Sequence, residues 1–142
     1  MQKGTIRLLL LSILFVFFSH QLTAQNASNK LYSVFVYNFT KYLEWPEQYD
    51  GFTIYVYGDS KVFNELQQMV NTKKVLGKPI FVKKILDLND LTSCQILYIS
   101  SNKSREIKDI LFRIKDKPVL LVGEQEGLTK KGCKTIFPQN KR

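Results

Sequence analysis

Few residues of this chain could carry acid–base, nucleophilic or metal chemistry. The one histidine, His20, lies near the start of the chain, inside a segment that we expect to be removed. The remaining chain has no imidazole, which excludes serine–histidine and cysteine–histidine catalysis and histidine metal sites. Ser100 and Lys103 have the Ser-x-x-Lys spacing of serine acyl-transferases, but the companion motifs are missing and a serine here is typical of a helix cap. We therefore expect no catalytic residue, no metal site and no cofactor.

Small and polar residues follow three of the expected strands, at the place where open α/β sheets bind ligands. Gly58 and Asp59 follow one strand, Ser100 follows another, and Gly123 and Glu124 follow a third. None of these turns is rich enough in glycine to surround a phosphate, and Glu124 has the pattern of a solubilising charge in a loop. The pattern favours tight turns. As an alternative, Gly58, Asp59, Ser100 and Gly123 are the candidate residues of a small-ligand pocket.

Residues 1–24 have the pattern of a secretory signal peptide. Two basic residues, Lys3 and Arg7, precede an apolar run over residues 8–18. This run is too short to span a bilayer, and Ala24 supplies a small residue at the expected cleavage site. We predict cleavage after Ala24 and export of the mature chain.

The composition is strongly basic, with a formal net charge of +9 at pH 7. Such a charge favours nucleic acid, an anionic membrane surface or an acidic protein as the partner. Export argues against nucleic acid, and the basic residues are scattered along the chain without a nucleic-acid-binding motif. A solvated face is the simplest interpretation of these charges.

The chain has two cysteines, Cys94 and Cys133, and an even count in an exported protein favours a disulfide. The expected sheet argues against that bond. Cys94 enters the third strand and Cys133 follows the fourth, so the two lie at opposite edges of the sheet, about 15 Å apart. Because that separation is beyond disulfide reach, we expect two unpaired thiols. Cys94 is expected to be buried and inert, whereas Cys133 could form a bond between two chains.

Alternating strands and helices must position these residues. Expected strands lie at residues 52–57, 79–84, 95–100, 118–122 and 135–137. The apolar stripes of the expected helices lie at residues 31–43, 62–70 and 107–114. This order predicts an α/β domain with a mainly parallel sheet of about five strands flanked by helices. The loop before the last strand is too short for a crossover helix, so the last strand is expected to run antiparallel.

The first helix is the element around which the rest of the chain is organised. Its apolar residues recur at three- and four-residue spacing, which places them on one face of the helix. These residues are Leu31, Val34, Phe35, Phe39 and Tyr42. We expect Phe35 and Phe39 to face the sheet, and Tyr37 and Lys41 to face solvent.

The single tryptophan, Trp45, marks the end of this helix. Pro46 disfavours helical geometry at the residue before it, so the helix is expected to run from a cap at Ser28 to about Glu44. One interpretation is that Trp45 anchors the corner between this helix and the first strand in the core. The other is that the corner binds a partner protein, since tryptophan and tyrosine are enriched at binding hot spots. The candidate partner-binding residues are then Tyr37, Lys41, Tyr42, Glu44 and Trp45.

The same stretch carries a resemblance to a known family. The sequence Asn-Phe-x-Lys-Tyr-x-Glu-Trp-Pro, from Asn38 to Pro46, is similar to the opening of the YfiR-like periplasmic repressors. Later segments agree with that family in the same order: Gly58-Asp59, Val75–Ile80, Cys94–Ile99, Pro118–Val122, and Gly127-Leu128 followed by Gly132. The resemblance covers nearly the whole chain after the signal peptide. It differs in one respect, because the further strand and closing helix of the family are not found after Phe137.

The resemblance implies one α/β domain over residues 25–142 that lacks the C-terminal strand and helix of the family. It implies a non-enzymatic periplasmic protein that binds and represses the periplasmic part of an inner-membrane sensor, such as a diguanylate cyclase. Release of the repressor would raise cyclic di-GMP and promote biofilm formation. A homodimer is a second kind of partnership that the sequence leaves open. The alternative function is a periplasmic small-ligand-binding module with its pocket at the carboxyl ends of the strands.

Overall fold

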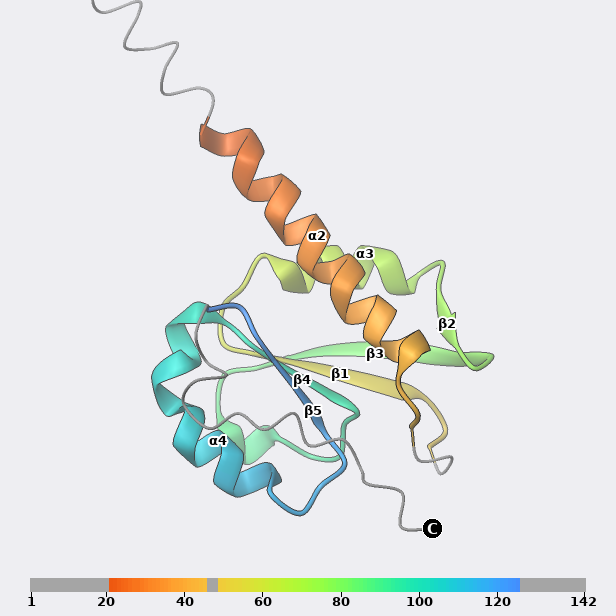
Figure 1. Ribbon diagram of the computed structural model, residues 1–142, viewed down its shortest axis with the longest axis vertical. Helices are drawn as coiled ribbons and strands as arrows, with labels where there is room; N and C mark the ends of the chain where they lie inside the picture. Colours follow the sequence, from red (N-terminus) through yellow and green to blue (C-terminus); the bar gives the residue numbers. More distant parts are fainter. Residues whose placement is uncertain (1–20, 46–48, 126–142) are drawn as a thin grey trace, which may run out of the picture.

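The computed structural model describes residues 21–45 and 49–125. The elements in chain order are α2 (Gln21–Tyr42), β1 (Phe52–Tyr57), α3 (Val62–Val70), β2 (Lys74–Val75), β3 (Lys78–Ile85), η1 (Leu88–Asp90), β4 (Ile96–Ile99), η2 (Ser101–Glu106), α4 (Ile107–Ile114) and β5 (Leu120–Gly123). Figure 1 shows α2 and α3 on one face of the sheet and α4 on the other.

Within the described residues, the sheet has five strands in the order β2-β3-β1-β4-β5. β1 pairs in parallel with both β3 and β4, and β4 pairs in parallel with β5. The predicted mainly parallel α/β domain is therefore confirmed. The antiparallel pair is β2 with β3, and Leu76 and Gly77 between these strands adopt positive φ in a two-residue turn. The antiparallel strand expected at residues 135–137 lies outside the described residues.

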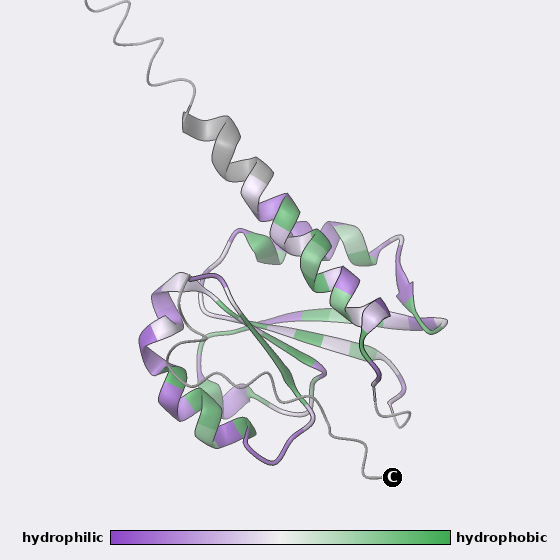
Figure 2. Cartoon of the chain, viewed as in Figure 1, coloured by the Kyte–Doolittle hydropathy of each residue, from purple (hydrophilic) through white to green (hydrophobic). Residues whose placement is uncertain are grey.

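Two apolar clusters hold the helices against the sheet, because successive side chains of a strand point to opposite faces. The cluster under α2 and α3 includes Val36, Phe52, Ile54, Val56, Val62, Leu66, Ile96 and Tyr98. The cluster under α4 includes Tyr55, Tyr57, Leu97, Ile99, Ile107, Ile110 and Ile114. Every residue of β4 is buried, and Figure 2 shows that the central strands are mostly apolar.

The face of α2 that packs on the sheet differs from the predicted one. Val36 is fully buried, whereas Phe35 and Phe39 are 49% and 38% exposed. Tyr37, which was expected in solvent, packs partly against the core, and Lys41 is exposed. The prediction that Phe35 and Phe39 face the sheet is therefore wrong, and so is the placement of Tyr37.

Two small polar residues explain why this face is buried. Ser33 and Thr40 are 3% and 2% exposed. The Ser33 hydroxyl donates to the carbonyl oxygen of Lys30 at 2.8 Å, and the Thr40 hydroxyl donates to that of Tyr37 at 2.6 Å. Because each hydroxyl is satisfied within the helix, its burial costs little. Small side chains at this face allow α2 to lie close to its neighbours, whereas Phe35, Phe39 and Tyr42 are exposed.

α2 also begins earlier than the sequence predicted. The helix starts at Gln21 and continues through Ser28, so the prediction that Ser28 is the N-cap is wrong. No glycine or proline interrupts residues 21–28, so nothing in this stretch breaks the helix. Figure 1 shows that the first half of α2 projects away from the sheet. Among the described helices, none is both long and apolar enough to cross a membrane.

Candidate functional site

The carboxyl ends of the four parallel strands are level in the sheet. Tyr57 is paired with Ile85 on one side and Ile99 on the other, and Ile99 is paired with Gly123. The chain crosses from β3 to β4 on the opposite side of β1, which makes the space beyond β1 and β4 the place where such sheets bind ligands. The structure thus brings the candidate ligand-binding residues to the carboxyl ends of the strands: Gly58, Asp59, Ser100 and Gly123.

The protein's own side chains fill the space beyond β1 and β4. Ser100 is fully buried, and its N–H and Oγ both donate to the carbonyl oxygen of Tyr57, at 3.0 and 2.7 Å. Gly58 has a φ of +92°, and a Cβ there would collide with Ser100, Asn102 and Lys103. Only glycine satisfies both this conformation and this close approach. The packing leaves no room for a ligand between Gly58 and Ser100.

Glu124 joins the loops that follow β1, β4 and β5. Its Oε1 accepts a hydrogen bond from Ser60 Oγ at 2.8 Å, and its Oε2 accepts two from Ser101, from the N–H and from Oγ, each at 2.8 Å. Its own N–H donates to the carbonyl oxygen of Ile99 at 3.0 Å. The sequence missed this role, because only the strand register brings Glu124 next to Ser60 and Ser101.

Asp59 forms an exposed ion pair with Lys84 of β3, with Oδ1 and Nζ 2.5 Å apart. The hydrogen bond from Lys84 lowers the pKa of the Asp59 carboxyl. Both residues border an open polar hollow of about 310 Å³, which is also lined by Ser60, Lys61, Phe63 and Asn64. The described residues contain no group of three side chains able to hold a metal ion.

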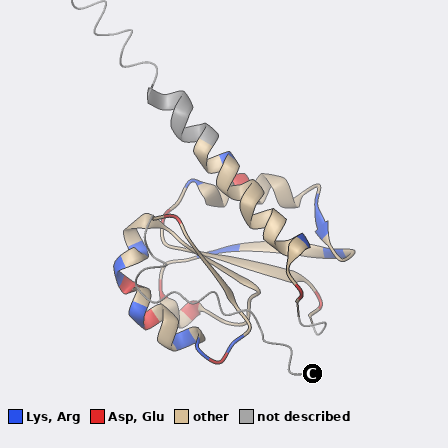
Figure 3. Ribbon diagram, viewed as in Figure 1, with Lys and Arg blue, Asp and Glu red and all other residues tan. Residues whose placement is uncertain are grey.

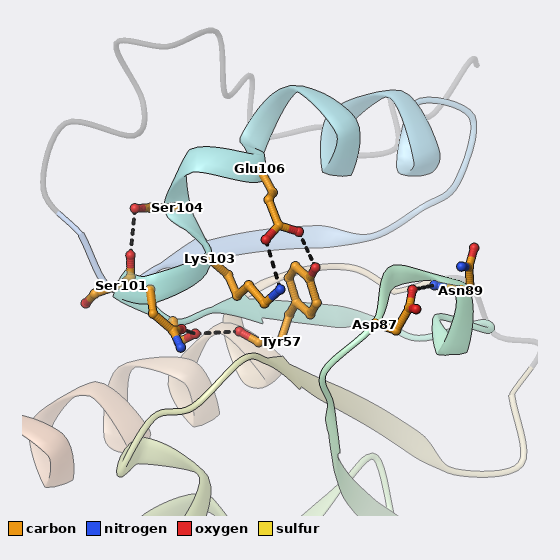
Figure 4. Close-up of polar contacts among 9 residues, drawn as sticks. Tyr57, Asp87, Asn89, Ser101, Lys103, Ser104 and Glu106 are labelled. Atoms are coloured by element: carbon orange, nitrogen blue, oxygen red, sulfur yellow. Dashed lines mark hydrogen bonds and ion pairs between the residues drawn. The ribbon is translucent and has the colours of Figure 1, made fainter.

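Lys103 is engaged by Tyr57 and Glu106 (Figure 4). Its Nζ lies 2.9 Å from Glu106 Oε1 and 4.7 Å from the centroid of the Tyr57 ring. The Tyr57 hydroxyl donates to the other oxygen of Glu106. The hydrogen bond to Glu106 is the main cause that raises the pKa of Lys103, so the amine stays protonated. A protonated and paired amine cannot act as the base of a catalytic pair with Ser100.

Trp45 anchors the corner between α2 and β1. Its Nε1 donates to the carbonyl oxygen of Thr40 at 3.2 Å, and its ring meets Phe52 edge-on with the centroids 4.9 Å apart. This geometry supports the interpretation of Trp45 as a core anchor. The side chain is only half-buried, so the corner keeps some aromatic surface that a partner can contact.

The other candidate partner-binding residues differ in exposure. Tyr42 is 82% exposed, and Lys41 and Glu44 are exposed as well. Tyr37 lies partly against the core, and the Nζ of Lys41 is 4.5 Å from the centroid of its ring. Tyr42, Lys41 and Glu44 are therefore available to a partner, and Tyr37 is available only in part.

A larger apolar surface lies on the side of α2 turned away from the sheet. Its residues and their exposed fractions are Leu31 53%, Val34 43%, Phe35 49%, Phe39 38% and Tyr42 82%. We call these five residues the outer face of α2. The helical spacing identified the five as one face, but it could not show that the face is exposed. Contiguous exposed apolar surface of this kind often marks a binding site.

Comparison with known proteins gives a match that covers the described fold except the first eight residues of α2. The sequence model of the YfiR/HmsC-like family matches residues 29–141. No curated protein matches the chain. The matched range includes the outer face of α2, the corner at Trp45 and the filled edge of the sheet.

Proposed function

The chain belongs to the YfiR/HmsC-like family, and from this premise we propose that it binds the periplasmic part of an inner-membrane sensor and holds that sensor inactive. Membership of the family indicates a periplasmic regulatory role in cyclic di-GMP signalling. In the proposal the sensor is a diguanylate cyclase, and release of the protein allows cyclic di-GMP to rise and promotes biofilm formation.

One observation favours a protein partner over a small ligand. The outer face of α2 exposes five large apolar side chains, whereas Ser100 and its neighbours fill the carboxyl ends of β1 and β4, where the alternative function would place its ligand pocket. The hollow beside Asp59 is polar and open, unlike the concave and mostly apolar sites that bind small molecules. The small-ligand alternative therefore has less support than the partner-binding function.

The proposed mechanism is a shift between two conformations of the sensor. A protein that binds the inactive conformation more tightly than the active one moves the population toward the inactive form. The shift depends on the difference between the two affinities, so the protein needs no catalytic group. The family is regulatory and non-catalytic, and the engagement of Lys103 by Glu106 agrees with that role.

Deletion and complementation test this function in the source cell. Deletion of the gene should raise cellular cyclic di-GMP, and the full chain supplied in trans should restore the original level. A chain that lacks residues 1–24 should fail to restore it, because the protein then stays on the wrong side of the membrane. An unchanged level of cyclic di-GMP after deletion would contradict the proposal. Full restoration of that level by the chain that lacks residues 1–24 would contradict it as well.

A further inference from the structure

The outer face of α2 has the shape of a helix-binding ridge. The five residues span positions 31–42, and a helix rises 1.5 Å per residue, so the ridge is about 16 Å long. At 100° per residue they fall within one side of the helix. Four of the five are between 38% and 53% exposed, so they form a low continuous ridge that another helix can pack against.

Positive charge borders this ridge on one side. α2 contains two charged residues, Lys30 and Lys41, and both are basic and exposed. They are eleven positions apart, which is close to three helical turns, so they lie on the same side of the ridge. Figure 3 shows that α4, by contrast, carries charges of both signs.

A polar residue lies within the ridge. Asn38 is seven positions after Leu31, so it falls near the middle of the outer face, and it is partly exposed. Burial of an amide in lipid without a hydrogen-bond partner costs free energy, which argues against a membrane as the occupant. A protein can supply that hydrogen bond, and a single polar residue in an apolar seam sets the register of two helices.

We propose, on the basis of the proposed function, that the outer face of α2 binds a helix of the sensor. This helix has an apolar stripe, acidic side chains along the border that faces Lys30 and Lys41, and a hydrogen-bonding side chain opposite Asn38. A second copy of this chain fits less well, because each copy keeps a formal net charge of +7 once Lys3 and Arg7 are removed from the +9 of the full sequence, and like charges oppose close approach.

Two synthetic peptides test the partner chemistry without the sensor. Both are amphipathic helices with the same leucine stripe, and one border carries glutamates in the first peptide and lysines in the second. Fluorescence anisotropy should show that the full chain binds the glutamate peptide about tenfold more tightly than the lysine peptide. A variant with Lys30→Glu and Lys41→Glu should reverse this preference.

Two matched variants distinguish loss of the binding surface from loss of the fold. Phe35→Asp on the outer face should abolish binding of the glutamate peptide, whereas Phe112→Asp, at a residue of α4 that is 74% exposed, should leave it unchanged. Circular dichroism melting should confirm that both variants are folded. Binding that survives Phe35→Asp, or equal binding of the two peptides, would overturn the inference.

A different occupant of the outer face of α2 would be revealed by a different measurement. A wild-type dimer in sedimentation that Phe35→Asp dissociates would assign the face to a second copy. Binding to phosphatidylglycerol vesicles that Phe35→Asp abolishes would assign it to the membrane, and displacement of the glutamate peptide by a peptide of residues 126–142 would assign it to this chain. Each of these results overturns the inference.

The two proposals can fail separately. If the purified periplasmic part of the sensor binds Phe35→Asp as tightly as wild type, the proposed function remains and this surface is excluded. If the peptides behave as expected but deletion leaves cyclic di-GMP unchanged, the surface remains and the proposed function is excluded.

Discussion

Burial determines the chemistry of Cys94. Its side chain is 5% exposed, and burial raises the pKa of its thiol to about 12, against an opposing effect of Lys117. Because the thiolate is the nucleophile, this residue is inert at neutral pH, as the sequence predicted. Cys133 lies outside the described residues, so the absence of a bond between the two cysteines stays a prediction.

The raised pKa of Cys94 makes stability depend on pH in the alkaline range. The thiol has an ordinary pKa of 9.0 and a folded pKa of about 12, so its contribution is fully present below pH 9 and is lost as the pH rises toward 12. Between pH 8 and about pH 10.5, wild type should lose about 2 kcal/mol more unfolding free energy than Cys94→Ala. Urea denaturation at both pH values measures this difference, and equal losses in the two proteins would contradict it.

Truncation of two adjacent residues of α2 should cost different amounts of unfolding free energy. Val36 is fully buried and Phe35 is half exposed, so Val36→Ala should cost about 1–3 kcal/mol. Phe35→Ala should stay within about 1 kcal/mol, although it removes a larger side chain. The apolar spacing of the sequence predicted that Phe35 faces the sheet. Urea denaturation decides, and a Phe35→Ala cost as large as that of Val36→Ala would mean that the outer face is covered.

Among the helices and strands, the sequence predicted best the ones whose apolar pattern indicates which side is buried. α3, α4, β1 and β4 were predicted close to their observed positions, because each has one clearly apolar face or is apolar throughout. α2 has apolar residues on both sides, and the buried side was decided by the close approach that Ser33 and Thr40 allow. That approach is a tertiary effect, so helical spacing could not predict it. β2 has two residues, too few to show a period.

Glu124 should stabilise three elements through one carboxylate. Its hydrogen bonds to Ser60 and Ser101 join the ends of β1, β4 and β5. Glu124→Ala should lower the unfolding free energy by about 1–2 kcal/mol and speed hydrogen exchange at the Ser101 amide. Glu44→Ala, at an exposed carboxylate after α2, is the control and should stay within about 0.5 kcal/mol. If both variants melt alike, Glu124 has only the solubilising role that the sequence indicated.

In the molecule as a whole, the sequence could predict where the candidate ligand site lies. It could not predict whether that site is open or filled by side chains. Because parallel strands end at one edge, the sequence correctly placed Gly58, Ser100 and Gly123 together. Whether that edge is open depends on the register, which brings Ser100 against Gly58. The exposed outer face of α2 follows from helix packing, and neither property has a signal in local sequence.

The fold thus covers some surfaces of the molecule and leaves another exposed. Helices cover both faces of the sheet (Figure 1), and side chains fill the space beyond β1 and β4. The outer face of α2 stays exposed beside two lysines. This distribution supports the proposal that the protein acts through contact with another protein.

Site-specific photo-crosslinking in living cells can show whether the outer face of α2 contacts a sensor. A photoreactive benzoylphenylalanine replaces Phe35 on the outer face of α2 or, as the control, Phe112 on α4, which is 74% exposed. We expect illumination to join position 35 to an inner-membrane sensor, identified by mass spectrometry, and position 112 to give no such product. A sensor crosslinked from position 112 but not from position 35, or from neither position, would contradict the proposed contact between the outer face of α2 and the sensor.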